Sequence, residues 1–189
     1  QNLPRGDTRD KKQIKAMFRA AMNKILVQLD FSQAEVRWLG ILSGDRALAA
    51  KYALAAELQE ALLKDPKNVD LKRRLKVDGD LHMATALAMY KLPLDLPFTD
   101  EKAAKKARQA AKVICFGLIY GKHYKSLAKD LKIKEDEAEE AVDLWMKQFP
   151  DAAKWLENVD NTIEKSCVAH SPFGRWRRLP EAAAADTAV

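Results

Sequence analysis

Four residues whose side chains suit phosphate and base binding recur at four-residue spacing: Arg108, Lys112, Phe116 and Tyr120. A step of four residues turns an α-helix by about 400°, so the four side chains drift only about 120° in all and form one stripe. The stripe is roughly 18 Å long at about 1.5 Å per residue, with two cations at one end and two aromatic rings at the other. This length and chemistry fit a nucleoside triphosphate.

The opposite side of the same predicted helix is small and apolar, and it comprises Ala107, Ala111, Ile114 and Leu118. A helix with one apolar side packs that side on the core, so the stripe is expected to face outward.

The ends of this helix are also marked in the sequence. Thr99 is the predicted N-cap, with Asp100 and Glu101 in the first turn, where negative charge favours the helix dipole. Gly121 is the predicted stop. Gly117 lies inside the helix at a cost of about 1 kcal/mol. It indicates either the close approach of a backbone, ring or ligand, or a tight helix crossing.

A second chemical candidate is Asp30, at the end of the apolar run ILVQLDF. Residues 25–31 are predicted to form a buried strand, followed by Ser32 as N-cap of a helix over about 33–42. Side chains at strand ends are held rigidly at an open edge, where catalytic groups are often found. Asp30 is therefore either a functional carboxylate or a cap of the next helix.

The composition favours one mostly helical domain: 189 residues with few Gly and Pro. The formal charge of +6 suits a polyanionic partner, but a solvated lysine-rich surface gives the same sum. No apolar run approaches the roughly twenty residues of a membrane span. Cys115 and Cys167 make neither a disulfide framework nor a zinc site, which favours a reducing compartment.

Further helices are predicted over about 46–63, 124–131, 135–149 and 152–165. Residues 67–78 form a short charged segment on the surface, whose basic run comprises Lys72, Arg73, Arg74 and Lys76. That run either contacts nucleic acid or is simply solvated.

Five segments of the chain, in order, resemble motifs of family A DNA polymerases. They are QNLPRG at 1–6, DFSQAEVRWLGILSGD at 30–45, GDLHMATA at 79–86, RQAAKVICFGLIYG at 108–121 and FGRWRRLP at 173–180. Accidental matches at five ordered places are implausible, so the chain is identified as a member of that family.

The resemblance implies an α+β, mostly α-helical fold: a fragment of the right-hand polymerase, with fingers helices and a piece of the palm sheet. Residues 1–53 would be a palm portion with the first catalytic motif, and 54–78 a surface insertion that exceeds the usual family spacing. Residues 79–170 would be the fingers, and 171–189 would return towards the palm.

The implied activity is template-directed DNA synthesis, in which a nucleotidyl group passes from a dNTP to a primer 3′ hydroxyl by a two-metal mechanism. Asp30 would supply one metal-bridging carboxylate, with the Phe31 backbone carbonyl beside it as a further ligand. The complete enzyme would hold two Mg²⁺ ions. His82, Arg108 and Lys112 would hold the triphosphate and neutralise the departing pyrophosphate, so Lys112 is a catalytic residue together with Asp30.

The same resemblance assigns residues that would contact the sugar, the base and the template strand. Phe116 would pack against the incoming sugar and base, and Tyr120 would stack near the templating base. Glu35 would fill the space of a ribose 2′ hydroxyl, in contact with Tyr120. Gln33 and Arg37 would contact primer and template, and Gln33 would contact the nucleotide as well. The further template and primer candidates are Gly121, Asn2 and Arg175.

The chain departs from the family in lacking the His-Asp-Glu motif that supplies the second catalytic carboxylate. It is therefore expected to be an excerpt that does not extend primers by itself. Its expected partners are primer-template DNA, a dNTP and the remainder of the polymerase chain, with no membrane, in the cytoplasm of a bacterium or of a virus-infected host. The alternatives are a non-catalytic helical nucleic-acid-binding module descended from such an enzyme, and an unrelated helical interaction domain.

Overall fold

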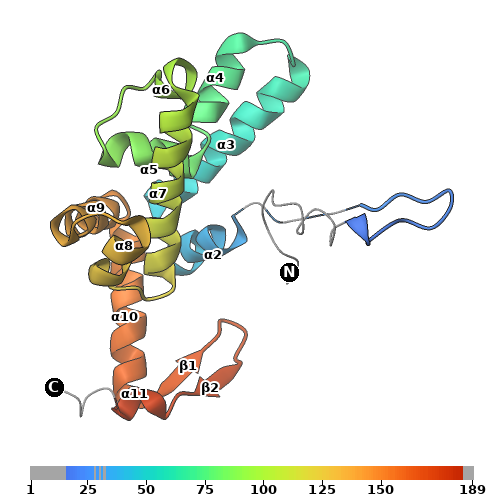
Figure 1. The fold of residues 1–189 in the computed structure, drawn as a ribbon. Coiled ribbons are helices and arrows are strands. Elements are labelled where there is room, and N and C mark those ends of the chain that lie inside the picture. Colours follow the sequence, from blue (N-terminus) through green and yellow to red (C-terminus); the bar gives the residue numbers. More distant parts are fainter. Residues whose placement is uncertain (1–15, 28, 30, 32, 185–189) are drawn as a thin grey trace. The chain divides into compact units, whose positions relative to one another are not determined.

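Figure 1 shows the computed structural model, which describes residues 16–27, 29, 31 and 33–184. The chain divides into two compact units, residues 1–32 and 33–189.

In the first unit, the predicted buried strand over residues 25–31 is wrong for the described residues. Those residues have no regular secondary structure, and the side chains of Ile25, Leu29 and Phe31 are 85%, 90% and 88% exposed. A strand needs a neighbouring strand to satisfy its backbone N–H and C=O groups. Among the described residues, the only paired strands lie in the second unit, between residues 168 and 178. Asp30 and the predicted cap Ser32 lie outside the described residues.

The second unit is mostly helical, as the sequence predicts. Its elements are α2 (Ala34–Ser43), α3 (Arg46–Lys64), α4 (Val69–Val77), α5 (Leu81–Met89), α6 (Leu96–Thr99), α7 (Glu101–Ile119), α8 (Tyr124–Leu131), α9 (Glu135–Gln148), α10 (Pro150–Ser166), β1 (Val168–His170), β2 (Trp176–Arg178) and α11 (Glu181–Ala184). None of the helices in the described part of the chain is long and apolar enough to cross a membrane.

Helix α7 is the central element of this unit and contacts α2, α5, α6, α8 and α9 (Figure 1). The predicted apolar side is confirmed, because Ala111, Ile114 and Leu118 are buried; Ala107, the fourth residue of that side, is half-buried. Gly117 lies where α7 meets α8, and a Cβ atom placed on it would lie only 2.4 Å from Cδ2 of Leu127. Of the alternatives that the glycine left open, the structure therefore supports a tight helix crossing.

Of the two predicted ends of α7, the N-terminal one is wrong by one residue and the C-terminal one is confirmed. Thr99 is not the N-cap: it ends α6, and its hydroxyl donates to the Asp95 carbonyl at 3.2 Å. Asp100 is the cap, because its carboxylate accepts a hydrogen bond from the Ala103 N–H at 2.9 Å. The predicted stop is confirmed by Gly121, whose φ of 71° no side-chain-bearing residue adopts freely.

Strands β1 and β2 form an antiparallel hairpin that pairs Val168 with Arg178 and His170 with Trp176. A turn that contains Pro172 and Gly174 connects them, with Gly174 at φ 79°. Residues 54–78, predicted as a surface insertion, form the second half of α3 and the antiparallel helix α4 (Figure 1). The domain boundaries given above stay predictions.

Candidate functional site

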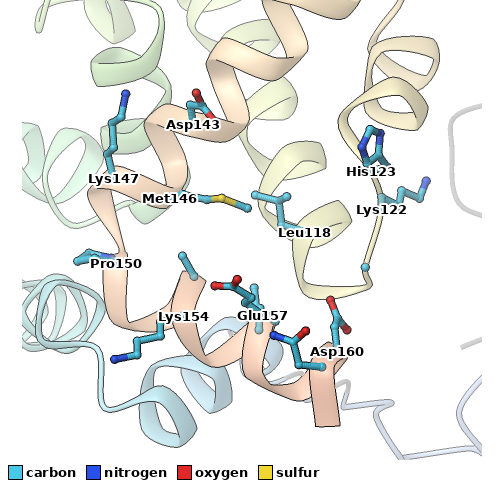
Figure 2. Close-up of a pocket in the computed structure, with 14 residues that line it drawn as sticks. Leu118, Lys122, His123, Asp143, Met146, Lys147, Pro150, Lys154, Glu157 and Asp160 are labelled. Atoms are coloured by element: carbon cyan, nitrogen blue, oxygen red, sulfur yellow. The ribbon is translucent and has the colours of Figure 1, made fainter. Parts of the chain in front are cut away.

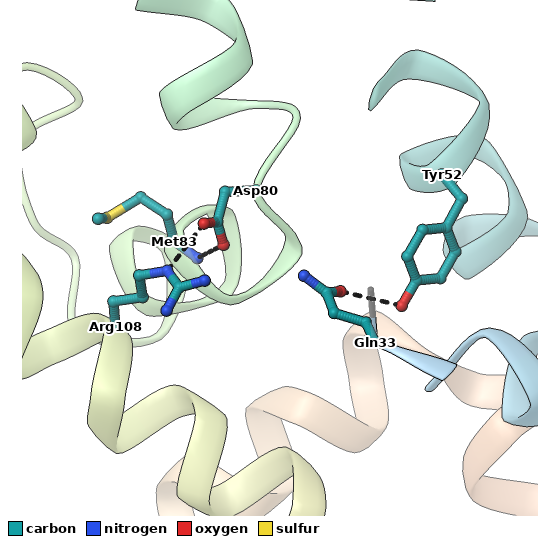
Figure 3. Close-up of polar contacts among 5 residues, drawn as sticks. All are labelled: Gln33, Tyr52, Asp80, Met83 and Arg108. Atoms are coloured by element: carbon teal, nitrogen blue, oxygen red, sulfur yellow. Dashed lines mark hydrogen bonds and ion pairs between the residues drawn. The ribbon is translucent and has the colours of Figure 1, made fainter. Parts of the chain in front are cut away.

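The cationic end of α7 is tied to the start of α5 by one carboxylate (Figure 3). Asp80 is the N-cap of α5: its Oδ1 accepts a hydrogen bond from the Met83 N–H at 3.0 Å. Its Oδ2 accepts a second hydrogen bond, from Nε of Arg108, at 2.8 Å. Asp80 therefore fixes both the helix that bears His82 and the guanidinium of Arg108.

His82 lies on α5 against the middle of α7. Its side chain is buried, with 1% exposed, and its ring centroid is 5.8 Å from that of Phe116. The Lys112 Nζ lies 5.5 Å from the centroid of the same Phe116 ring. Three of the four stripe residues are half-buried, because α5 covers part of the stripe that the sequence predicts to face outward. Tyr120, the fourth, is the C-cap residue of α7 and is 67% exposed.

The imidazole of His82 is held neutral by its surroundings. Burial lowers its pKa to about 4; Asp80 opposes this shift, and the positive charges of Arg108 and Lys112 add to it. Its Nε2 is buried and has no hydrogen-bond partner among the described residues. A buried polar atom without a partner is uncommon and costly, so this nitrogen is available for a bound ligand.

A second group of predicted residues meets around Tyr52 of α3 (Figure 3). The Tyr52 hydroxyl donates a hydrogen bond to Oε1 of Gln33 at 3.1 Å, and the Arg37 guanidinium carbon lies 4.3 Å from the centroid of the Tyr52 ring. Burial raises the pKa of Tyr52, so its hydroxyl stays a donor. Glu35, which lies between Gln33 and Arg37 in the sequence, is exposed in the first turn of α2.

Among the described residues, no interaction joins the remaining predicted site residues to these two groups. Gly121 and Arg175 are exposed, and the Arg175 backbone N–H donates to the Ser171 hydroxyl at 3.1 Å. Phe31 lies in the first unit, and Asn2 and Asp30 fall outside the described residues.

No cluster of three or more His, Cys, Asp or Glu side chains in the described part of the chain could hold a metal ion. The predicted metal ligand Asp30 is outside that part. Cys115 and Cys167 are free thiols, and burial raises the pKa of Cys115 to about 12, so that thiol stays protonated.

Comparison with known proteins decides the family. The model of DNA polymerase family A matches residues 1–189. The chain belongs to this family. The "DNA polymerase I, thermostable" of Thermus aquaticus is 29% identical over 168 residues, which cover 89% of this chain and 17% of that protein. DNA polymerase I of Helicobacter pylori strain 26695 is 30% identical over 152 residues, or 80% of this chain and 14% of that protein.

The chain is also similar to a phage enzyme: a DNA polymerase of Bacillus phage SP01 is 27% identical, and the match covers 89% of this chain and 16% of that protein. The chain thus spans about a sixth of these polymerases. The fold matches the POL domain of Pol1 from M. smegmatis, a structure in complex with DNA primer-template and dNTP, with a TM-score of 0.65 and 24% identity. That match covers 95% of this chain and 27% of the other.

Sequence reasoning about this family A chain missed two positioning residues, Asp80 and Tyr52. Asp80 directly precedes the helix of His82, and an Asp at that position is a typical N-cap, which is a usable signal. Nothing local marks Tyr52, because its partner Gln33 is 19 residues away.

The family A chain also contains a cavity of about 870 Å³ between the end of α7, α9 and α10 (Figure 2). Leu118 and Met146 contribute apolar surface to it. The charged side chains that line it are equal numbers of bases and acids: Lys122, Lys147 and Lys154, with Asp143, Glu157 and Asp160. Balanced charges give no preference for a triphosphate. Of the predicted nucleotide and template residues that the structure describes, only Gly121 lines it.

The lowered pKa of His82 predicts how stability depends on pH. Between about pH 6.5 and pH 4, the unfolded chain binds a proton at His82 that the folded chain does not, so the free energy of unfolding falls as pH falls through this window. Chemical denaturation from pH 7 to pH 4 measures the trend. Carboxylates titrate there too, so His82→Gln is the control, and its stability should fall less steeply. Parallel curves for the two proteins, or an NMR titration of His82 near 6.5, would contradict the expectation.

Proposed function

We propose that this chain is the nucleotide-binding part of a DNA polymerase, which transfers a nucleotidyl group from a dNTP to a primer 3′ hydroxyl. The observation that supports this most is the convergence of His82, Lys112 and Phe116 on one face, with Arg108 held one turn away by Asp80. The relatives are named DNA polymerases, and the M. smegmatis POL domain is in complex with DNA primer-template and dNTP.

The triphosphate would lie along the cationic end of α7. Arg108 offers a planar fork of N–H donors, and Lys112 a compact positive charge. The neutral His82 can donate one hydrogen bond, and its Nε2, which has no hydrogen-bond partner among the described residues, is the atom that would donate it to a phosphate oxygen. The primer 3′ oxygen forms a bond to the α-phosphorus, and the bond from the α-phosphorus to the oxygen that bridges it to the β-phosphate breaks. The donors named above stabilise the pyrophosphate that leaves.

The sugar and base would lie towards the aromatic end. Phe116 presents a ring that is already oriented by His82 and Lys112, so little side-chain entropy is lost on binding. Tyr120 is exposed enough to stack near the templating base. Glu35 would exclude a ribose 2′ hydroxyl.

Primer and template would contact Gln33 and Arg37, which Tyr52 orients, as well as Gly121, Arg175 and Asn2. Divalent metal, Mg²⁺ in this proposal, would be held by Asp30 and the Phe31 carbonyl with carboxylates from the remainder of the polymerase. When bound, it would neutralise charge on the reacting phosphates. In this assignment residues 1–53 belong to the palm, 54–78 are an insertion, 79–170 are the fingers and 171–189 return to the palm.

Lys112→Ala is expected to weaken dATP binding to the chain by about tenfold or more, because charge-assisted hydrogen bonds contribute about 1.5–3 kcal/mol each. NMR titration with dATP and Mg²⁺ measures the dissociation constant. Inorganic tripolyphosphate, which has no base, should show the same loss.

The matched control is Lys106→Ala, which removes an exposed lysine from another side of α7. It should leave the dissociation constant unchanged. Equal affinities for Lys112→Ala and wild type would overturn the assignment of the triphosphate to this face.

A further inference from the structure

Helix α4 has a concentrated positive charge that the nucleotide site does not use. Its nine residues, VDLKRRLKV, include four basic side chains and a single acidic one. Lys72, Arg73, Arg74 and Lys76 are all exposed, and in the described part of the chain none of them has an ion-pair partner within 4 Å. Such a cluster of unpaired cations repels itself and is stabilised by a polyanion.

The same surface contains an exposed aromatic ring. Phe98 of α6 is 46% exposed, and the Arg73 guanidinium carbon and the Lys76 Nζ lie 5.2 Å and 4.9 Å from its ring centroid. Arg73 and Lys76 are three residues apart and therefore lie on one side of α4, and Lys72 is four residues before Lys76 on that side. We call Lys72, Arg73, Lys76 and Phe98 the α4 patch.

The patch is held in place by the core beneath it. Val77 of α4 is buried in a cluster with Met83, Leu87 and Ala104. The Lys76 Nζ donates a hydrogen bond to the Pro97 carbonyl at 2.9 Å, which ties α4 to α6 directly beside Phe98. The cations of α4 and the ring of α6 are thus presented together, joined by this hydrogen bond.

We propose that the α4 patch binds single-stranded nucleic acid, with phosphates on Lys72 and Arg73 and a base stacked on Phe98. Cations close to a partly exposed aromatic ring are the combination that sequence-independent single-strand binding uses. A base in a duplex is already stacked and cannot reach the ring. An acidic peptide would pair with the cations, but its carboxylates do not stack on the ring.

The neighbouring cleft between α4 and α7 is less suitable for a strand. This cleft, of about 280 Å³, is lined by Lys76, Lys105 and Arg108, but Asp80 and Glu101 lie there as well. In this cleft Arg108 is paired with Asp80 and Lys105 with Glu101, so two of its three cations lie beside a carboxylate that would repel further phosphates of a strand. The outer side of α4 therefore provides the free positive charge.

The α4 patch lies in residues 54–78 and the adjoining α6 and shares no residue with the stripe on α7, so it can bind a strand whether or not the stripe binds dNTP. The test uses the 189-residue chain, without nucleotide or metal, and a fluorescein-labelled oligo-dT of about twelve nucleotides, within the usual range of site sizes. Fluorescence anisotropy gives the dissociation constant at several salt concentrations.

Lys72→Gln/Arg73→Gln is expected to lower the slope of log affinity against log salt by about 1.4, because each single-strand phosphate contact contributes about 0.7. Phe98→Leu should weaken binding by about fivefold or more with little change in slope, since it removes stacking and no charge. The control Lys129→Gln/Lys134→Gln removes two exposed lysines of the α8–α9 region and should change neither quantity.

Equal salt slopes for the two double variants would overturn the proposal, because binding would then reflect overall charge. Tighter binding of a duplex of the same length, unaffected by Phe98→Leu, would overturn the assignment to a single strand. Titration of Lys72→Gln/Arg73→Gln with dATP separates the two proposals: its dATP affinity should match wild type even when oligo-dT binding is lost.

Discussion

Asp45→Ala is expected to lower the free energy of unfolding by about 3 kcal/mol, because it leaves two buried backbone donors without an acceptor. Asp45 is 1% exposed and precedes α3. Its Oδ1 accepts a hydrogen bond from the Leu48 N–H at 2.9 Å, and its Oδ2 accepts one from the Ala152 N–H at 3.0 Å. One carboxylate therefore caps α3 and the first turn of α10, from positions 107 residues apart.

Urea denaturation of the purified chain measures this effect. Asp100→Ala is the control, because Asp100 is exposed and caps only α7, so its loss should cost about 1 kcal/mol. Asp45→Asn should lie between the two, since an amide has one acceptor oxygen and places an N–H₂ group against the other donor. A loss for Asp45→Ala no greater than that for Asp100→Ala would show that the link to α10 contributes nothing.

Gly117→Ala is expected to destabilise the chain by about 2 kcal/mol, although alanine is the better helix former by about 1 kcal/mol. The added methyl group would lie 2.4 Å from Cδ2 of Leu127, which is itself completely buried. Leu127 cannot move away without disturbing the core between α7 and α8, so overpacking outweighs helix propensity. Thermal and urea unfolding measure the change.

The double variant Gly117→Ala/Leu127→Ala separates overpacking from other effects. If the clash is the cause, removing Leu127 should cost less in the Gly117→Ala background than in wild type, and the two changes should not add. Additive losses, or a stabilised Gly117→Ala, would refute the crossing as the reason for glycine. Because Phe116 precedes this residue, the crossing also fixes the rotation of α7 and hence of the stripe.

Much of the candidate site follows from local sequence. The four-residue spacing of Arg108, Lys112, Phe116 and Tyr120 predicts the stripe because the helical period is a local property of the backbone. The bounds of α8 and the stop at Gly121 are confirmed for the same reason: caps and turn residues act within a few positions. The ordered motifs also predicted the family correctly.

Other features depend on contacts that no local pattern contains. The strand predicted over residues 25–31 is absent from the described residues there, because an apolar run forms a strand only beside another strand. The Thr99 prediction failed by one residue, since two adjacent side chains can both cap and only the start of α7 decides between them.

The sequence by itself determined the chemical identity of the stripe and the helix that displays it. The tertiary structure decided that His82 lies against Phe116, that Asp80 holds Arg108, and that Tyr52 holds Gln33. Those partners are 19 to 34 residues apart in the chain and meet only because α5 and α3 pack beside α7 and α2. Packing of that kind is set by the whole core, whereas periodicity and capping are set by a single turn of helix.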